Sequence, residues 1–176
     1  MFMPRLGSVS SAGRRKTLLP PIINTFGFAG AVTGGFPSTN GRALVTRWNL
    51  PVAANLISLE LTTFNTATAA SDVKGLILLS AAGEPTTVLH VTSGQTSPIG
   101  GAVLTYALSG FLAAGDYYLG GVHNSFNNNL GQSDIAAYET RMANGTFDYT
   151  TPPGTWPGTD ASYSISIAVK VNYSPA

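Results

Sequence analysis

The chain has 176 residues, which is enough for one domain with an appendage and a sizeable core. Only 10% of the residues are charged, against about 25% in a typical soluble domain, and 20 glycines and 11 prolines leave little room for long helices. The lack of cysteine excludes disulfides, thiol catalysis and zinc sites with cysteine ligands. A surface so poor in charge is weakly protected against association, so we expect a member of an assembly.

The charge is distributed unevenly along the chain. Residues 1–59 contain six basic residues and no acid, whereas residues 60–176 contain three basic and eight acidic residues. The first part therefore carries +6 and the second −5, which sums to the net charge of +1. This polarity predicts an N-terminal segment that docks on an acidic surface, either protein or nucleic acid; a solvated basic tail is the alternative.

A basic and apolar segment, GRRKTLLPPIINTFGFAGAVTGG, spans residues 13–35. Its order of charges and apolar residues is that of an export signal, but Pro20 and Pro21 interrupt the apolar run, which is also too short for a transmembrane helix. We therefore favour an extended arm over residues 1–36 that gains order by lying on a neighbouring molecule. The expected assembly residues of this arm are Arg14, Arg15, Lys16, Leu18, Leu19, Ile22, Ile23, Phe26 and Phe28.

Residues 37–176 have the pattern of β-strands separated by turns. The stretch NLISLELTTF alternates, which places Ile57, Leu59 and Leu61 on one face of a strand. The stretch GLILLS is a continuous apolar run, which is typical of a central strand.

The dipeptide Asn144-Gly145 lies between two β-prone runs and predicts a hairpin with a two-residue turn. In that register Arg141 lies opposite Asp148, an opposite-charge pair that would support the hairpin. The closing stretch SYSISIAVKVNY alternates over residues 162–173 and predicts one long strand. Its apolar face would carry Tyr163, Ile165, Ile167, Val169, Val171 and Tyr173.

Eight or nine strands with turn residues between them predict an all-β fold, an antiparallel β-sandwich of jelly-roll type, with the extended N-terminal arm in front. The sandwich domain would span residues 37–176. We expect that deletion of residues 2–30 leaves this sandwich folded but prevents its incorporation into an assembly.

The sequence offers little for catalysis. Its eight acidic residues are scattered singly, and the two histidines, His90 and His123, lie on different predicted strands. No phosphate-binding loop or calcium-loop motif occurs. We therefore expect neither an enzyme nor a metal or cofactor site.

One loop has the composition of a binding site. The sequence HNSFNNN follows a tyrosine-containing strand, and amide side chains beside aromatic faces are the groups that bind neutral sugars. The alternative is that asparagine suits tight loops and that the tyrosines face the core. The candidate sugar-binding residues are Tyr118, His123, Asn124, Asn127, Asn128 and Trp156.

Two stretches, ALSGFLAAGDYYLGGV and SYSISIAVKVNYSPA, together with the charge-poor composition, resemble β-sandwich domains of tailed-phage virion proteins. The resemblance covers residues 100–176, and carbohydrate-binding modules share its turn–strand pattern. It implies a virion protein that is trimeric or otherwise symmetric, as a tail fibre or baseplate adhesin or as a capsid decoration protein.

The expected partners are other virion proteins, copies of the chain itself and, for an adhesin, a host-surface glycan. No membrane is expected as a partner, because the apolar run is too short and too interrupted to span one. Nucleic acid is not expected either, because the basic residues of the body are not interleaved with aromatic ones. The alternative is a carbohydrate-binding module without catalytic activity.

Overall fold

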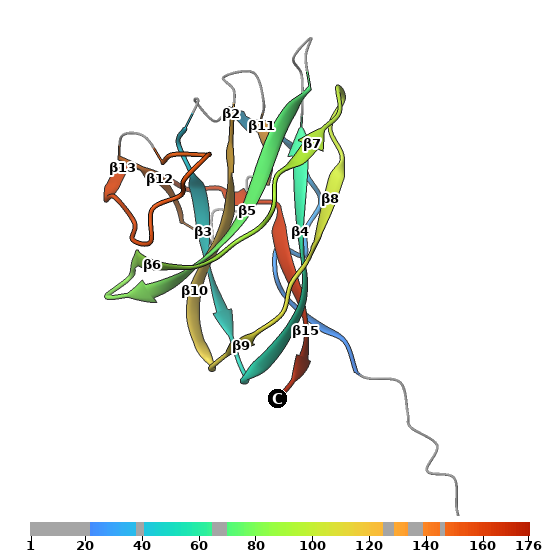
Figure 1. Cartoon of the computed structure of the whole chain (residues 1–176), viewed down its shortest axis with the longest axis vertical. Helices are drawn as coiled ribbons and strands as arrows, with labels where there is room; N and C mark the ends of the chain where they lie inside the picture. Colours follow the sequence, from blue (N-terminus) through green and yellow to red (C-terminus); the bar gives the residue numbers. More distant parts are fainter. Residues whose placement is uncertain (1–21, 38–40, 65–69, 125–128, 134–138, 145–146) are drawn as a thin grey trace, which may run out of the picture.

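The predicted fold class is confirmed by a computed structural model, which describes residues 22–37, 41–64, 70–124, 129–133, 139–144 and 147–176. Two antiparallel sheets pack face to face, and the described ranges contain no helix (Figure 1). Sheet 1 contains β1 (Asn24–Gly27), β2 (Gly34–Pro37), β4 (Ala54–Phe64), β8 (Val103–Ala107), β9 (Phe111–Leu112), β11 (Asn129–Ser133), β14 (Ser166–Ile167) and β15 (Val169–Pro175). Sheet 2 contains β3 (Leu44–Leu50), β5 (Ser71–Ala81), β6 (Glu84–Val91), β7 (Gln95–Ser97), β10 (Gly115–His123), β12 (Thr140–Ala143) and β13 (Thr159–Tyr163).

The strand pairing is that of a jelly roll. The antiparallel pairs β1–β15, β3–β10, β4–β8 and β5–β6 are nested along the chain, as in one long hairpin that has been rolled up. Rolling places β1, β15, β4 and β8 in one sheet and β3, β10, β5 and β6 in the other.

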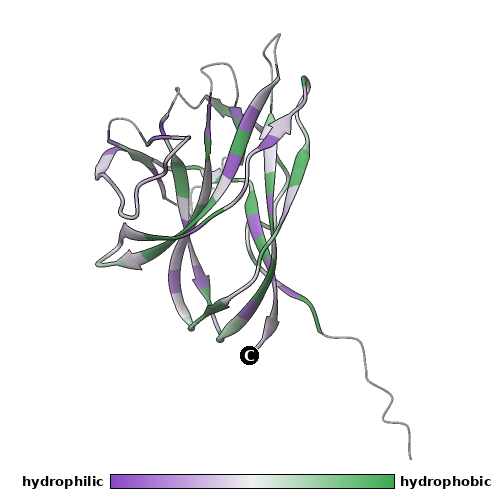
Figure 2. Ribbon diagram, viewed as in Figure 1, coloured by the Kyte–Doolittle hydropathy of each residue, from purple (hydrophilic) through white to green (hydrophobic). Residues whose placement is uncertain are grey.

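The core lies between the two sheets. Apolar and polar residues alternate along many of the strands (Figure 2), so that one side of each strand enters the core. Leu59 and Leu61 of sheet 1 and Ile77 and Leu119 of sheet 2 are completely buried there. The predicted central strand is confirmed, since β5 lies between β10 and β6.

A second apolar cluster covers the outer face of sheet 2. Residues 147–158, here called the strap, lie over this face and bury Phe147 completely against Val45, Leu78 and Tyr118. The strap is held along the edge strand β6, where the backbone N–H of Trp156 donates to the Thr86 carbonyl at 2.6 Å. The strap explains why residues 76–78 are all apolar, because Leu76 and Leu78 contact this cluster while Ile77 faces the core.

The predicted boundary of the arm is wrong. Strand β1 pairs with β15 along its whole length, and β2 pairs with β11, so both belong to sheet 1. Phe26 and Phe28 are buried in the core of their own chain rather than presented to a neighbour. Deletion of residues 2–30 would therefore remove β1 from the sandwich, and we now expect this deletion to disrupt the fold instead of leaving it intact. The arm residues Arg14, Arg15, Lys16, Leu18 and Leu19 lie outside the described residues.

The predicted hairpin at Asn144-Gly145 is also wrong. Strand β12 pairs with β3 and with β13, so Arg141 lies opposite Val45 and Ser162 instead of Asp148. The chain from residue 147 onward forms the strap, because Phe147 is buried in the outer cluster of sheet 2 and its N–H donates to the Gly41 carbonyl. The Arg141 guanidinium, which is 10% exposed, is paired with Glu84 at 2.9 Å and with Glu139.

The closing stretch is not one strand but three. Strand β13 pairs within sheet 2, whereas β14 and β15 belong to sheet 1, so the chain crosses between the sheets near residues 164–165. The predicted apolar face is nevertheless directed to the core throughout, since Tyr163 and Ile165 pack against the core and Ile167, Val169, Val171 and Tyr173 are buried in it.

Ile57 departs from the predicted face of its strand. The β4–β15 register shifts at this point, because Asn172 lies opposite Ser58 and Tyr173 lies opposite Leu56. The bulge brings Leu56 into the core and leaves Ile57 exposed on the outside of sheet 1.

The burial of Phe26 gives a direct test of the corrected boundary. Its ring packs edge-on against Tyr173 at 5.9 Å and Tyr117 at 6.4 Å between centroids. We expect Phe26→Ala to lower the free energy of unfolding by roughly 3–5 kcal/mol, measured by urea denaturation, since it leaves a cavity in the core. The control Ile23→Ala, at a side chain that is 59% exposed, should change it by less than about 0.5 kcal/mol. Equal, small effects of both substitutions would contradict the assignment of β1 to the sandwich.

Candidate functional site

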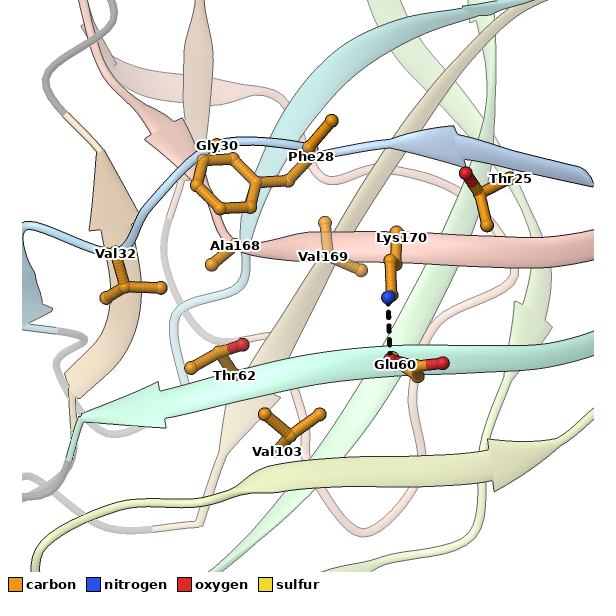
Figure 3. A pocket seen from close by; sticks show the side chains of 11 residues that line it. Thr25, Phe28, Gly30, Val32, Glu60, Thr62, Val103, Ala168, Val169 and Lys170 are labelled. Carbon is orange, nitrogen blue, oxygen red and sulfur yellow. Dashed lines mark ion pairs between the residues drawn. The ribbon is translucent and has the colours of Figure 1, made fainter.

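A hollow of about 300 Å³ opens on the outer face of sheet 1. It lies between the segment that follows β1 and the strands β15, β4 and β8 (Figure 3). Its lining residues are Thr25, Phe28, Ala29, Gly30, Val32, Glu60, Thr62, Val103, Ala168, Val169 and Lys170.

Two backbone hydrogen bonds create the hollow. The Phe28 N–H donates to the Val169 carbonyl at 2.8 Å, and the Thr33 N–H donates to the Gln132 carbonyl at 2.9 Å. Residues 29–32 connect these two attachment points with the small side chains of Ala-Gly-Ala-Val. Because these side chains are small, they leave space between the connecting segment and the sheet.

An ion pair neutralises the polar part of the hollow. The Lys170 amine lies 3.0 Å from the Glu60 carboxylate, on directly opposed residues of β15 and β4 (Figure 3). Asn172 Nδ2 donates to Glu60 Oε1 at 2.7 Å and to Ser58 Oγ at 2.8 Å. The hydrogen bond from Asn172 and, after it, the contacts with Lys170 hold the pKa of Glu60 below its ordinary value.

This arrangement suits an apolar group better than a reaction. Glu60 stays ionised and is engaged by two partners, so it is poorly placed to transfer protons near neutral pH. The side chains of Phe28, Val32, Val103 and Ala168 offer apolar surface around it. No cluster of three or more metal-binding side chains occurs in the part of the chain that the structure describes.

Tyr118 does not face solvent, as a sugar-binding residue would. Only 1% of it is exposed, it packs in the outer cluster of sheet 2 beneath the strap, and its hydroxyl donates to the Gly83 carbonyl. Trp156 packs against the same cluster, half-buried, and its indole N–H donates to Thr159 Oγ1 at 3.3 Å. The structure thus brings these two aromatic residues together, but as part of the packing of the strap.

His123 lies on the opposite side of β10 from Tyr118. It is completely buried and opposes Val73, which is a core residue, so its ring lies between the sheets. Neither ring nitrogen has a hydrogen-bond partner in the structure. Burial lowers the pKa of His123 to about 4. His123, a candidate sugar-binding residue from the sequence, thus has no surface that a ligand outside the sandwich could contact.

Asn124 is exposed at the start of the asparagine loop, but it has a structural role. Its Oδ1 accepts from the Asp72 N–H at 3.0 Å, and its own N–H donates to the Asp72 carbonyl at 3.1 Å. These bonds extend the pairing of β10 and β5 by one residue, which explains an asparagine at this position. Asn127 and Asn128 lie outside the described residues.

Among the described assembly residues of the predicted arm, Ile22 and Ile23 are exposed. Their exposed fractions are 72% and 59%, which contrasts with the buried Phe26 and Phe28 that follow. They lie next to Asn24, which opposes Tyr173 close to the C-terminus.

The hollow was missed by the sequence predictions. The alternating pattern does place Glu60 and Lys170 on the polar faces of their strands, but the pairing of β4 with β15 across 110 residues of chain (170 − 60) is not visible in either strand. Comparisons with protein-family models, curated proteins and solved structures find no match, so the site is interpreted from this chain alone. Within the described residues, no helix has the length and apolar character needed to cross a membrane.

The burial of His123 predicts acid sensitivity. Its pKa of about 4 in the folded chain lies below the ordinary 6.5 that applies after unfolding. As pH falls from about 6.5 to 4, the unfolded chain takes up a proton that the folded chain does not, so the free energy of unfolding should decrease by up to roughly 3 kcal/mol. His123→Leu should remove this part of the pH dependence, measured by urea denaturation of both proteins across that range. An unchanged pH dependence in the variant would contradict a buried, neutral His123.

Proposed function

We propose that the protein is an accessory structural subunit of a tailed-phage virion, either a tail fibre or baseplate adhesin or a capsid decoration protein. Its N-terminal segment would anchor the subunit, and the sandwich would be displayed outward. The phage setting is supported by the sequence resemblance of residues 100–176. The anchored arrangement is supported chiefly by Ile22 and Ile23, two exposed apolar residues at the start of the described chain.

The two ends of the sandwich differ in a way that suits anchoring and display. Asn24 opposes Tyr173, and Pro175 opposes Ala54, so the start of β1 and the C-terminus lie at one end (Figure 1). Asn124 follows β10 at the other end of the sandwich, where it bonds Asp72 at the start of β5. A subunit held at the first end would therefore present the end with Asn124 away from its support.

The distribution of charge also supports an anchoring segment. Residues 1–21 contain four of the nine basic residues and no acid, whereas residues 22–176 contain five basic and eight acidic residues, a balance of −3. All five described basic side chains have partners: four form ion pairs, and Lys74 contacts the ring and carbonyl of Tyr149. The basic charge available for an acidic partner surface is thus concentrated before residue 22.

Apolar burial would supply most of the affinity. Leu18, Leu19, Ile22 and Ile23 could each contribute roughly 1.5–3 kcal/mol on burial, before the cost of ordering the segment. Phe26 and Phe28 do not add to this sum, because they are already buried in their own chain. The alternative of a carbohydrate-binding module has lost support, since Tyr118 and His123 are buried.

The test compares the full chain with a version that lacks residues 2–21. Each is expressed in cells infected with the phage whose genome encodes the chain. We expect the full chain to appear in purified particles, labelled by an antibody against residues 22–176. The shortened chain should keep the far-ultraviolet circular dichroism spectrum and melting temperature of the full chain, because it retains all strands, but should remain in the soluble fraction.

A further shortened chain that lacks residues 2–30 serves as the control for unfolding, since it loses β1. Incorporation of the chain without residues 2–21 at the level of the full chain would contradict anchoring by this segment. Absence of the full chain from the particles would contradict the virion assignment.

A further inference from the structure

The outer faces of the two sheets are covered differently. The strap covers sheet 2 and completes a second apolar cluster there. On sheet 1, Val103 of β8 and Phe111 of β9 are each 58% exposed and Ile57 of β4 is 37% exposed. The most exposed large apolar side chains on the strands of sheet 2, Leu79 and Leu89, are each 39% exposed. Exposed apolar side chains on one sheet, beside a hollow, are typical of a surface that binds a protein partner.

This surface carries no net charge. Within the described strands β1, β4, β8, β9 and β15, the only charged residues are Glu60 and Lys170, which neutralise each other. A strongly charged partner would find no complementary group here. A second copy of the same surface meets no like-charge repulsion, which favours another copy of this chain as the occupant.

Phe111 and the hollow match in size and in apolar character. Phe111 projects from β9, at the edge of sheet 1, and the hollow has apolar walls formed by Phe28, Val32 and Val103. A cavity of about 150 Å³ is enough to hold benzene. The hollow of about 300 Å³ therefore has room for a phenyl ring.

The two features are too far apart to meet within one chain. Phe111 pairs with Asn55, whereas the hollow lies beside Thr62, seven residues further along β4. At about 3.3 Å per residue, this separation is about 23 Å. A contact between them therefore joins different patches of two copies, and such a contact can repeat around a closed ring.

We propose that copies of this chain associate through sheet 1, with Phe111 of one copy inserted into the hollow of the next copy, to form a closed ring. The inference rests on the proposed function and deepens it by naming the residues through which copies of the chain, expected as partners from the sequence, would contact one another. It does not depend on residues 1–21, so its failure can be distinguished from failure of the anchor.

The absence of cysteine allows a direct test by disulfide trapping. Ser109→Cys places a thiol near Phe111 while keeping its ring, and Ala29→Cys places one at the hollow; both positions are exposed. After mixing and mild oxidation of the two full-length variants, we expect a cross-linked dimer. It should form at least about tenfold faster than in a mixture of Ser109→Cys with Leu89→Cys, an exposed position on sheet 2, because the contact raises the effective concentration of the thiols.

A second pair of variants tests the role of Phe111 in association. Phe111→Asp should lower the mass of the full chain in solution to that of a monomer, whereas Leu89→Asp should leave the oligomer unchanged. Both variants should melt within a few degrees of the parent, because both side chains are exposed.

Four results would overturn the proposal. The first is equal cross-linking in the two mixtures. The second is cross-linking of Ser109→Cys with itself at the rate of the mixture, which would indicate a two-fold contact of identical edges. The third is a monomeric parent protein, and the fourth is a Phe111→Asp variant that associates as the parent does. None of these results bears on the incorporation test for residues 2–21.

Discussion

The structure depends on one constraint: the chain must bury the apolar faces of two sheets, and it has few charged residues to keep the remaining surface soluble. Each sheet buries one face against the other, and this common core accounts for the alternation along the strands. Sheet 2 also buries part of its second face, through Phe147 and Trp156 of the strap, whereas sheet 1 exposes Ile57, Val103 and Phe111. Val103 and Phe111 of sheet 1 are therefore more exposed than any large apolar side chain on the strands of sheet 2, and this imbalance connects the fold with the proposed role in an assembly.

The two proposed contacts, through the N-terminal segment and through sheet 1, should differ in how strongly they depend on salt. Residues 1–21 and the exposed Ile22 and Ile23 combine basic charge with apolar side chains, so their docking should weaken as salt screens the charges. The surface of sheet 1 has a single neutralised ion pair, Glu60 with Lys170, and its association should depend little on salt. A subunit with both contacts could form a ring through its body and be attached to a support through its N-terminal segment.

Local patterns in the sequence predicted the fold class, the central strand β5 and the core face of the closing stretch. These features depend on residues close together in the chain, as in the alternation from Tyr163 to Tyr173. The predictions that failed all concern places where contacts between residues far apart in the sequence override the local preference. Asn144-Gly145 has the local signal of a hairpin, but Phe147 gains more by burial against sheet 2, and the basic and apolar segment before β1 obscured the pairing of Phe26 with Val171. The hollow was beyond prediction for the same reason, because Phe28, Glu60 and Ala168 come from three distant segments.

The most direct test of this account is the mass of the full-length protein in solution, measured by sedimentation equilibrium at low and at high salt. We predict a defined oligomer whose mass is a small whole multiple of 18.2 kDa and which persists at high salt, because the contact through sheet 1 is apolar. A monomer of 18.2 kDa under both conditions would contradict the claim that the open face of sheet 1 is an assembly surface.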